Sequence, residues 1–361
     1  MTIIKESAPH LRRKASVTRM MVDVLIALAP TLIFSFVVYP LNTLFVYLIS
    51  LAVMIGSEFL ACGIRNKFQY KKPGVFGVNN VLTAAISAVI YTLIMPAGAP
   101  LYAVAIGALA GIVLGKLVFG GLGSNIFNPA AVGMLFAKLC FGSQYTQVNT
   151  WYYTIPDAAA GATPLGLVNG GFLSNINTYP ILDLFLGRIP GTLGEVYAVT
   201  ILVGLAYLLF RRSADYRIVV SFFGTFTLLS LVAGLSVMAL GVELNILKYV
   251  AFSLLTGGIL FGGTFMLTDP VTSPINAPSR WMYGMIAAVF TIFIRLFAAL
   301  PEGMGFSILI ANMIAVVLDH YEWSSSRYTW KKFLAMGLLV VVPALIIFFA
   351  IKFGGVYNVQ H

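Results

Sequence analysis

Three segments of this largely apolar chain carry residue types that could do chemistry. They hold glycine, proline, asparagine, aspartate and threonine at a density that a lipid-facing helix does not tolerate without compensation. The segments are residues 119–132, 160–165 and 261–274. Breaks in a helix leave backbone N–H groups that can hold an anionic or heterocyclic ligand. We therefore look for function in these segments.

The first and third segments resemble each other. Each begins Phe-Gly-Gly, and eight or nine positions after the phenylalanine come Asn128–Pro129 in one and Asp269–Pro270 in the other. This similarity predicts an internal duplication with broken helices, in which matching breaks build a central site. The alternative is that Gly-Gly permits close helix packing and that proline only ends helices.

The middle segment is different in kind, because it lies in a polar stretch. Its Gly161-Ala162-Thr163-Pro164 sequence presents the Thr163 hydroxyl on a tight bend of small residues. On physical grounds alone this is an ordinary turn, since glycine and proline are common turn residues.

Several ionisable residues fall within apolar runs. Such residues are expensive in a bilayer and are functional by default. Asp269 is the preferred candidate for orienting a ligand or ion, because it follows a helix break. Lys116 and Lys138 could instead extend to the membrane surface, since long cationic side chains do so near span ends. The candidates are Glu58, Lys116, Lys138, Glu195, Asp269 and Arg295.

The composition defines the elements that must position these residues. Hydrophobic residues make up 60% of the 361 and charged residues 9%, against about 25% charged in soluble domains. This excludes a soluble fold and predicts an all-α polytopic membrane protein of ten or eleven spans. Three windows, 126–142, 195–210 and 305–318, are short for a full crossing and could be tilted, re-entrant or broken. The full set of windows is 21–40, 43–62, 76–95, 101–119, 126–142, 195–210, 218–240, 247–267, 282–300, 305–318 and 333–353.

Charge patterning predicts the topology. With the N-terminus in the cytoplasm, basic clusters at 1–20, 65–72, 211–217 and 327–332 fall on one side. The opposite side is nearly free of lysine and arginine, and the loop 143–194 faces outward there. The positive-inside rule also accounts for the net charge of +10, so we expect no nucleic-acid partner.

We expect residues 1–361 to form a single membrane domain, with a first helical half at 1–142 and a second at 195–361. Both Phe-Gly-Gly segments fall on the cytoplasmic side in this topology. An inverted duplication would not place them together unless a short segment is re-entrant. The two cysteines lack the clustered spacing of a metal site, so we expect no metal centre held by this chain alone.

Five motifs, taken in order, resemble the family of the Rnf D subunit and the B subunit of the sodium-translocating NADH:quinone oxidoreductase. The short N-terminal extension resembles the Rnf protein more, which argues against quinone chemistry. A departure lies at Ala160, where the family often has Ser or Asp. The motifs are residues 119–130, Gly161–Leu165, Leu193-Gly-Glu195, Thr268–Pro274, and Pro301-Glu-Gly303 leading to Asn312 and Asp319.

The resemblance implies that a separate flavin transferase esterifies Thr163 with the phosphate of FMN, using Gly161 and Ala162 as the recognition turn. It also implies a second, non-covalent flavin, riboflavin, nearer the membrane core. Asn128 and Asp269 are our candidate contacts for this second flavin. The flavin chemistry would belong to the cofactor, while the protein supplies binding, orientation and electrostatics.

The implied function is that of a multi-pass inner-membrane subunit that relays electrons between ferredoxin and NAD in a Na⁺- or H⁺-translocating complex. It is not catalytic alone, and its partners would be the other membrane, iron–sulfur and flavin subunits. The alternatives are the B subunit of the quinone oxidoreductase, a small-solute transporter or channel with duplicated halves, and a purely structural assembly subunit.

Overall fold

The computed structural model describes residues 17–68, 76–142, 176, 180–189, 191–298, 303–320 and 325–353. Over these residues the protein is helical, with no strand. The expected all-α fold is thereby confirmed. The turn predicted at Thr163, with Gly161 and Ala162, lies outside the described residues.

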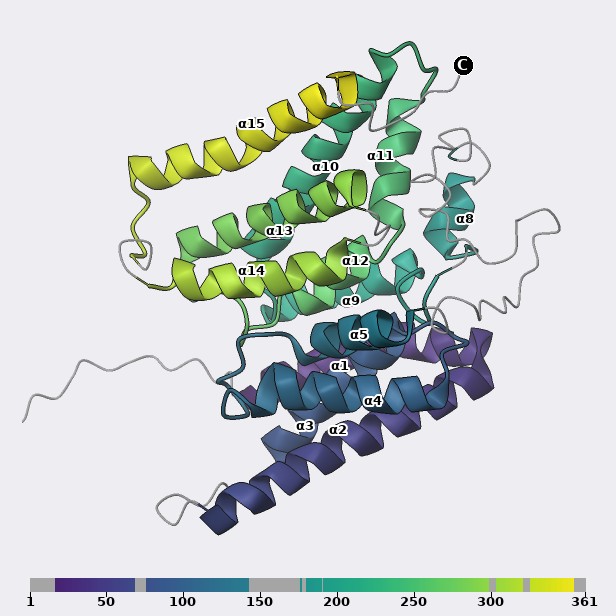
Figure 1. Ribbon diagram of the computed structural model, residues 1–361, viewed down its shortest axis with the longest axis vertical. Helices are drawn as coiled ribbons and strands as arrows, with labels where there is room; N and C mark the ends of the chain where they lie inside the picture. Colours follow the sequence, from purple (N-terminus) through teal and green to yellow (C-terminus); the bar gives the residue numbers. More distant parts are fainter. Residues whose placement is uncertain are drawn as a thin grey trace, which may run out of the picture.

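The described helices form two sets of five, with two further helices, α8 and α15 (Figure 1). The short helix α8 (Ile181–Leu186) precedes the second set, and α15 (Trp330–Phe353) follows it. The first set is α1 (Val17–Val38), α2 (Pro40–Phe68), α3 (Val78–Ile94), α4 (Leu101–Ile112) continued by the π-helix η1 (Val113–Leu117), and α5 (Pro129–Cys140). The second is α9 (Ala198–Arg211), α10 (Tyr216–Met238), α11 (Ile246–Leu255) continued by α12 (Ile259–Phe261) and the π-helix η3 (Gly262–Met266), α13 (Ala277–Phe297), and α14 (Met304–Leu318).

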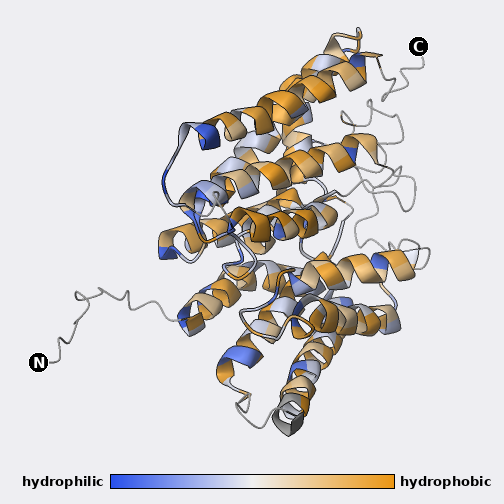
Figure 2. Cartoon of the chain, turned by 60° about the vertical axis from the view of Figure 1, so that its left-hand side comes forward, coloured by the Kyte–Doolittle hydropathy of each residue, from blue (hydrophilic) through white to orange (hydrophobic). Residues whose placement is uncertain are grey.

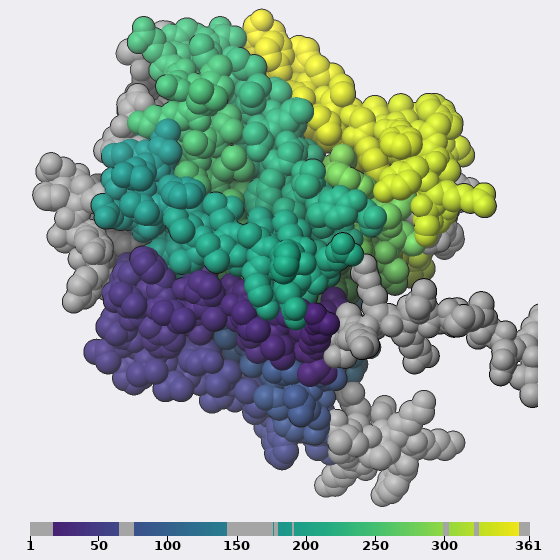
Figure 3. Space-filling view, turned by 180° about the vertical axis from the view of Figure 1, so that it is seen from behind, coloured from purple at the N-terminus to yellow at the C-terminus, as the bar shows by residue number. Residues whose placement is uncertain are grey.

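The two sets stack as two layers, one above the other in Figures 1 and 3. They meet where α1 packs on α9 and α5 packs on α14. Helix α15 lies on α10 and α13, at the outer edge of the second layer. Apolar residues cover the helices over most of their length, and polar residues gather at their ends (Figure 2). This distribution is typical of helices that face lipid.

Each of the eleven expected apolar windows overlaps one of these helices or a broken helix. Among the described residues, five helices are long and apolar enough to cross a membrane, namely α1, α2, α10, α13 and α15. Helix α11 and the α12–η3 segment, which meet at a 62° bend, make a sixth crossing if they are counted as one span. The remaining apolar helices have 10–17 residues, so shortness is a general property of this fold and is not confined to the three windows in which it was expected.

The two sets run in opposite senses. Asp23 near the start of α1 forms an ion pair with Arg211 at the end of α9, whereas Phe34 near the end of α1 packs on Tyr197, which caps the start of α9. The first set therefore begins on one side of the molecule and the second begins on the other, as an inverted repeat requires. A duplication of the sequence itself stays a prediction.

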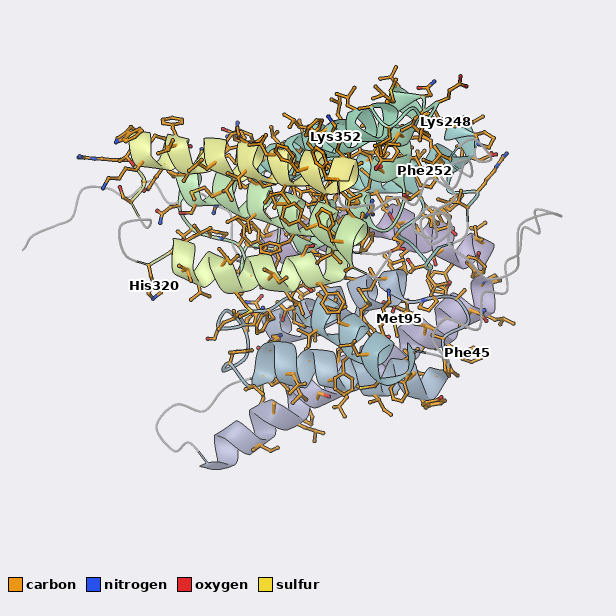
Figure 4. All side chains as sticks on the ribbon, turned by 45° about the horizontal axis from the view of Figure 1, so that its top comes forward. Phe45, Met95, Lys248, Phe252, His320 and Lys352 are labelled. Atoms are coloured by element: carbon orange, nitrogen blue, oxygen red, sulfur yellow. The ribbon has the colours of Figure 1, made fainter. Side chains whose placement is uncertain are left out.

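Basic residues gather on the side where α1 begins, which we call the basic side. Arg19, Arg211, Arg212, Arg217 and Arg280 lie at helix ends there, and ion pairs join Asp215 to Arg217 and Arg280. The expectation that the opposite side is nearly free of cations is wrong, because the last or first turns of four helices there carry Lys138, Lys248, Arg295 and Lys352. Figure 4 shows Lys248 and Lys352 at the opposite end of the bundle from His320.

Candidate functional site

A cavity lies between the two layers, toward the basic side. Its empty volume is about 770 Å³, which includes open space at its mouth. The walls come from α1, α3, η1, α5, α9 and η3 and from loops at 122–128, 213–214 and 268–271. Asn128 and Asp269, predicted to share one site, both line it.

The wall of the first set is built by close packing of α4 and η1 against α5. A Cβ on Gly111 would lie 2.5 Å from the carbonyl oxygen of Pro129, and one on Gly115 would lie 2.9 Å from the Cα of Pro129. Only glycine permits such an approach of two backbones. The π-helix that follows carries Lys116 into the cavity wall, and π-helices of this kind are frequent at functional sites.

Lys116 is buried and ion-paired. Its Nζ lies 3.1 Å from Oε2 of Glu58 on α2, with the side chains of Lys116 and Glu58 3% and 1% exposed, and it donates to Thr83 Oγ1 at 2.8 Å. Asn80 donates to the other carboxylate oxygen of Glu58 at 2.9 Å. Lys116 therefore does not extend to the membrane surface. The two opposite charges offset each other in this buried position, although Oε2 of Glu58 accepts no hydrogen bond.

Asn128 ends the loop and begins α5. Its side-chain oxygen accepts from the backbone N–H groups of Ala130 and Ala131, at 3.0 and 3.4 Å, and Pro129 occupies the first helical turn. This is a favourable N-cap. Because the oxygen is engaged in capping, the amide nitrogen of Asn128 is the group that remains to contact a ligand.

The wall of the second set is built by η3 and the loop after it. Phe265 and Asp269 line the cavity. The Asp269 carboxylate accepts from Val271 N at 3.2 Å and from Thr272 Oγ1 at 3.3 Å, so it stabilises the turn that opens the loop. Asp269 and Lys116 line the same cavity from different layers.

The two Phe-Gly-Gly motifs are not structurally equivalent. Gly120 and Gly121 form a turn after η1 with φ of +113° and +94°, whereas Gly262 and Gly263 lie inside η3, where Phe222, Phe223 and Met304 leave no room for a Cβ. The first motif follows the fourth helix of its set and the second lies in the third. The two motifs therefore occupy different positions in their sets.

The other predicted site residues lie apart from the cavity. Lys138 is in the last turn of α5, and Arg295 donates to backbone carbonyls at the break between α11 and α12. Glu195 lies beside Gly258 at that break. Sequence reasoning missed Phe265, Thr83, Ser87 and Asn125 as lining residues. Of these, only Asn125 and Phe265 fell within a segment already singled out.

Residues 192–194, which precede α9, are hydrogen-bonded to the C-terminal end of α3. Leu193 and Gly194 donate their backbone N–H groups to Met95 O and Leu93 O, at 2.9 and 2.8 Å, and Thr192 Oγ1 donates to Leu93 O at 3.0 Å. Figure 4 shows Met95 on the side opposite His320. Thr83, which lines the cavity, precedes Leu93 by ten residues on α3. The cavity wall and the hydrogen bonds at Leu93 are therefore about 15 Å apart along this helix.

The fold and the cavity define a multi-pass membrane protein with a cavity between two oppositely oriented sets of helices. A model of the NQR2, RnfD, RnfE family matches residues 4–326, so the chain belongs to this family. Helix α15 lies beyond the matched residues.

Similar proteins include three that are named as the B subunit of a Na⁺-translocating NADH-quinone reductase. The protein from Chromohalobacter salexigens is 38% identical over 240 residues, which are 65% of this chain and 57% of the relative. Those from Pseudomonas aeruginosa strain LESB58 and Azotobacter vinelandii are 37% and 35% identical over 65% of this chain and 58% of the relative. The match thus spans less than two thirds of these relatives.

Proposed function

We propose that this chain is a membrane subunit of a redox-driven, cation-translocating complex that oxidises NADH, and that the cavity between its two layers binds a flavin. Family membership and the names of the relatives support the first part. Those names favour the quinone-reductase interpretation over the ferredoxin interpretation. The second part rests on one observation, the cavity that both helix breaks line together with a buried lysine.

The cavity suits a planar heteroaromatic ring. Phe265, Ile86 and Ile90 offer apolar surface, and Asn125, Asn128 and Thr268 offer polar groups at the rim of the two loops. Few, well-placed polar groups in an apolar setting are typical of cofactor sites. These side chains would bind and orient the ring, and the bound flavin would supply the electron transfer.

A second flavin, FMN esterified to Thr163, is part of the same proposal. It is supported by the Gly161–Leu165 motif and by the attachment of residues 192–194 to the end of α3 that is distant from the cavity. With the basic side in the cytoplasm, Thr163 would be near the outer face of the inner membrane. Electrons would then pass between the two flavins along α3 in concert with partner subunits.

Cation coupling would use charged groups at membrane depth. Lys116 and Asp269 line the cavity, and Glu58 forms an ion pair with Lys116. A change of charge on a ligand in the cavity would therefore alter the electrostatic energy of these three side chains. The proposal does not depend on the remaining ionisable candidates, which do not line the cavity, namely Lys138, Glu195 and Arg295.

Flavin content of the purified chain tests the proposal. After co-expression with a flavin transferase, Thr163→Ala should abolish the flavin fluorescence that survives denaturing electrophoresis. Ser87→Phe places a ring in the cavity, since Ser87 lines it and is 8% exposed, and should remove the flavin that denaturation releases while sparing the covalent one.

Val203→Phe on the exposed face of α9 is the matched control and should retain both flavins. A folded wild-type chain without flavin would contradict the proposal and favour a solute transporter. Retention of covalent flavin by Thr163→Ala would contradict the attachment site. Ubiquinone-dependent and ferredoxin-dependent NADH turnover of the assembled complex separates the two family interpretations.

A further inference from the structure

Lys116 brings a positive charge to a cavity whose walls are otherwise mainly apolar or neutral. Asp269 is the other charged residue among the described lining residues, and its carboxylate accepts from its own turn. We propose that Lys116 sets the redox potential of the ring held in the cavity, by stabilising the negative charge that the ring gains when it accepts electrons without a matching proton. This inference rests on the proposed function, because it requires a redox-active ligand there.

The position of Lys116 is fixed by its surroundings. It is the fourth residue of η1 (Val113–Leu117), and the helix behind it packs backbone to backbone on α5 at Gly111 and Gly115. An ammonium group has three N–H donors. Thr83 accepts from one of them, and Glu58 Oε2 lies 3.1 Å from Nζ as an ion pair without a hydrogen bond, so a donor is left for a ligand in the cavity.

Phe265 lines the same cavity from the other layer and is the fourth residue of η3 (Gly262–Met266). The two π-helices thus contribute a cation from one layer and an aromatic ring from the other. An aromatic face and a point charge together suit a flat ring that changes charge, and they give no advantage to a neutral, saturated solute.

Glu58 stands behind Lys116 and does not line the cavity. A ligand therefore meets the lysine first and the carboxylate at a greater distance. Charges in a medium of low dielectric constant interact strongly over such distances. Removing the lysine charge makes the cavity more negative, whereas removing the carboxylate charge makes it more positive.

These two changes have opposite signs, and this distinguishes an electrostatic role from a structural one. Lys116→Met should weaken binding of the reduced ring relative to the oxidised ring at least tenfold, which lowers the midpoint potential by about 59 mV for a one-electron couple or about 30 mV for a two-electron couple. Glu58→Gln should shift the same ratio about threefold or more in the other direction and raise the potential.

The experiment is a spectroscopic redox titration of the full chain, purified in detergent and carrying Thr163→Ala so that the cavity flavin is observed alone. Lys116→Arg should keep the wild-type potential within about a threefold change of the binding ratio, because it keeps the charge. The control Lys248→Met removes a lysine of α11 that does not line the cavity and should leave the potential unchanged.

If Lys116→Met does not fold, the double variant Lys116→Met/Glu58→Gln, which leaves no unpaired charge behind, should still titrate below Glu58→Gln. Potentials that stay constant, or that fall in both single variants, overturn the role of Lys116 while leaving the cavity flavin in place. A folded Thr163→Ala chain without any flavin overturns the proposed function and this inference together.

Discussion

Each layer of the molecule holds a buried cation in the last turn of its fourth helix, and the two cations are used differently. Lys116 at the end of η1 binds side chains, the carboxylate of Glu58 and the hydroxyl of Thr83. Arg295 near the end of α13 binds backbone, donating to the carbonyls of Ser253, Thr256 and Gly257 at 2.7–3.0 Å.

The surroundings of the two cations also differ. The guanidinium of Arg295 lies 5.4 Å from the centre of the Phe226 ring, and its three carbonyl partners are those left without helical donors where α11 breaks. Lys116 faces a cavity. A planar guanidinium with five donors suits a fixed clamp, whereas a flexible ammonium suits a site whose charge changes. We infer that Arg295 stabilises the fold and that Lys116 interacts with a ligand in the cavity.

The sharpest way to break this comparison is Arg295→Met. Hydrogen bonds to charged groups contribute about 1.5–3 kcal/mol each, and three carbonyls would lose their donor, so we expect the free energy of unfolding to fall by more than about 3 kcal/mol. Detergent-titration unfolding followed by circular dichroism measures this.

Arg295→Lys should recover part of the loss, because an ammonium reaches fewer carbonyls. The cavity flavin of the folded fraction should keep its potential. A stable Arg295→Met protein with a displaced flavin potential would reverse the roles assigned to the two cations.

Hydropathy predicted the helices and their approximate ends because spanning a bilayer is a local property of sequence. The pattern of helix breaks led us to expect Asn128 and Asp269 near one another, and both line the cavity, while their contact with a flavin stays a prediction. The pairing of Lys116 with Glu58 was not predicted, because α3 and α4 lie between them in the chain and the packing of these helices decides it.

The match between the two Phe-Gly-Gly motifs did not correspond to equivalent positions in the two sets, again because the packing of the helices decides the use of each glycine. A tripeptide of this kind serves either a turn with positive φ, as at Gly121, or close packing inside a helix, as at Gly263. Sequence alone does not separate these uses. Thr163, Gly161 and Ala162 lie outside the described residues, so the covalent attachment stays a prediction.

The packing of the two fourth helices gives a second, smaller test. Alanine at Gly111 of α4 brings a Cβ within 2.5 Å of Pro129 O, and alanine at Gly284 of α13 brings one within 2.7 Å of Ile218 O. Overpacking of this kind costs about 1–3 kcal/mol, so both variants should unfold at lower detergent concentration by similar amounts.

Their effect on the ligand should differ. Pro129 lines the cavity and Ile218 does not, so Gly111→Ala should lower the content of non-covalent flavin and Gly284→Ala should not. Equal loss of flavin from both folded variants would show that the cavity depends on the whole bundle and not on the wall around Lys116.

The smallest expected effect concerns the asparagines that precede α5 and α13. Asn128 accepts two backbone N–H bonds at the start of α5, whereas the Asn276 side chain caps no backbone N–H of α13 and accepts from Ser326 at the surface. Loss of an N-cap costs about 0.5–2 kcal/mol. Chemical unfolding should therefore show the free energy of unfolding falling by about 1 kcal/mol in Asn128→Ala and by less than about 0.5 kcal/mol in Asn276→Ala.

Asn128→Asp separates the cap from the cavity. It keeps the capping oxygen, so it should restore the stability of α5, but it places a negative charge in the cavity and should lower the flavin potential. Equal stability of the two alanine variants would mean that the cap at Asn128 does not stabilise α5, the helix that lines the cavity.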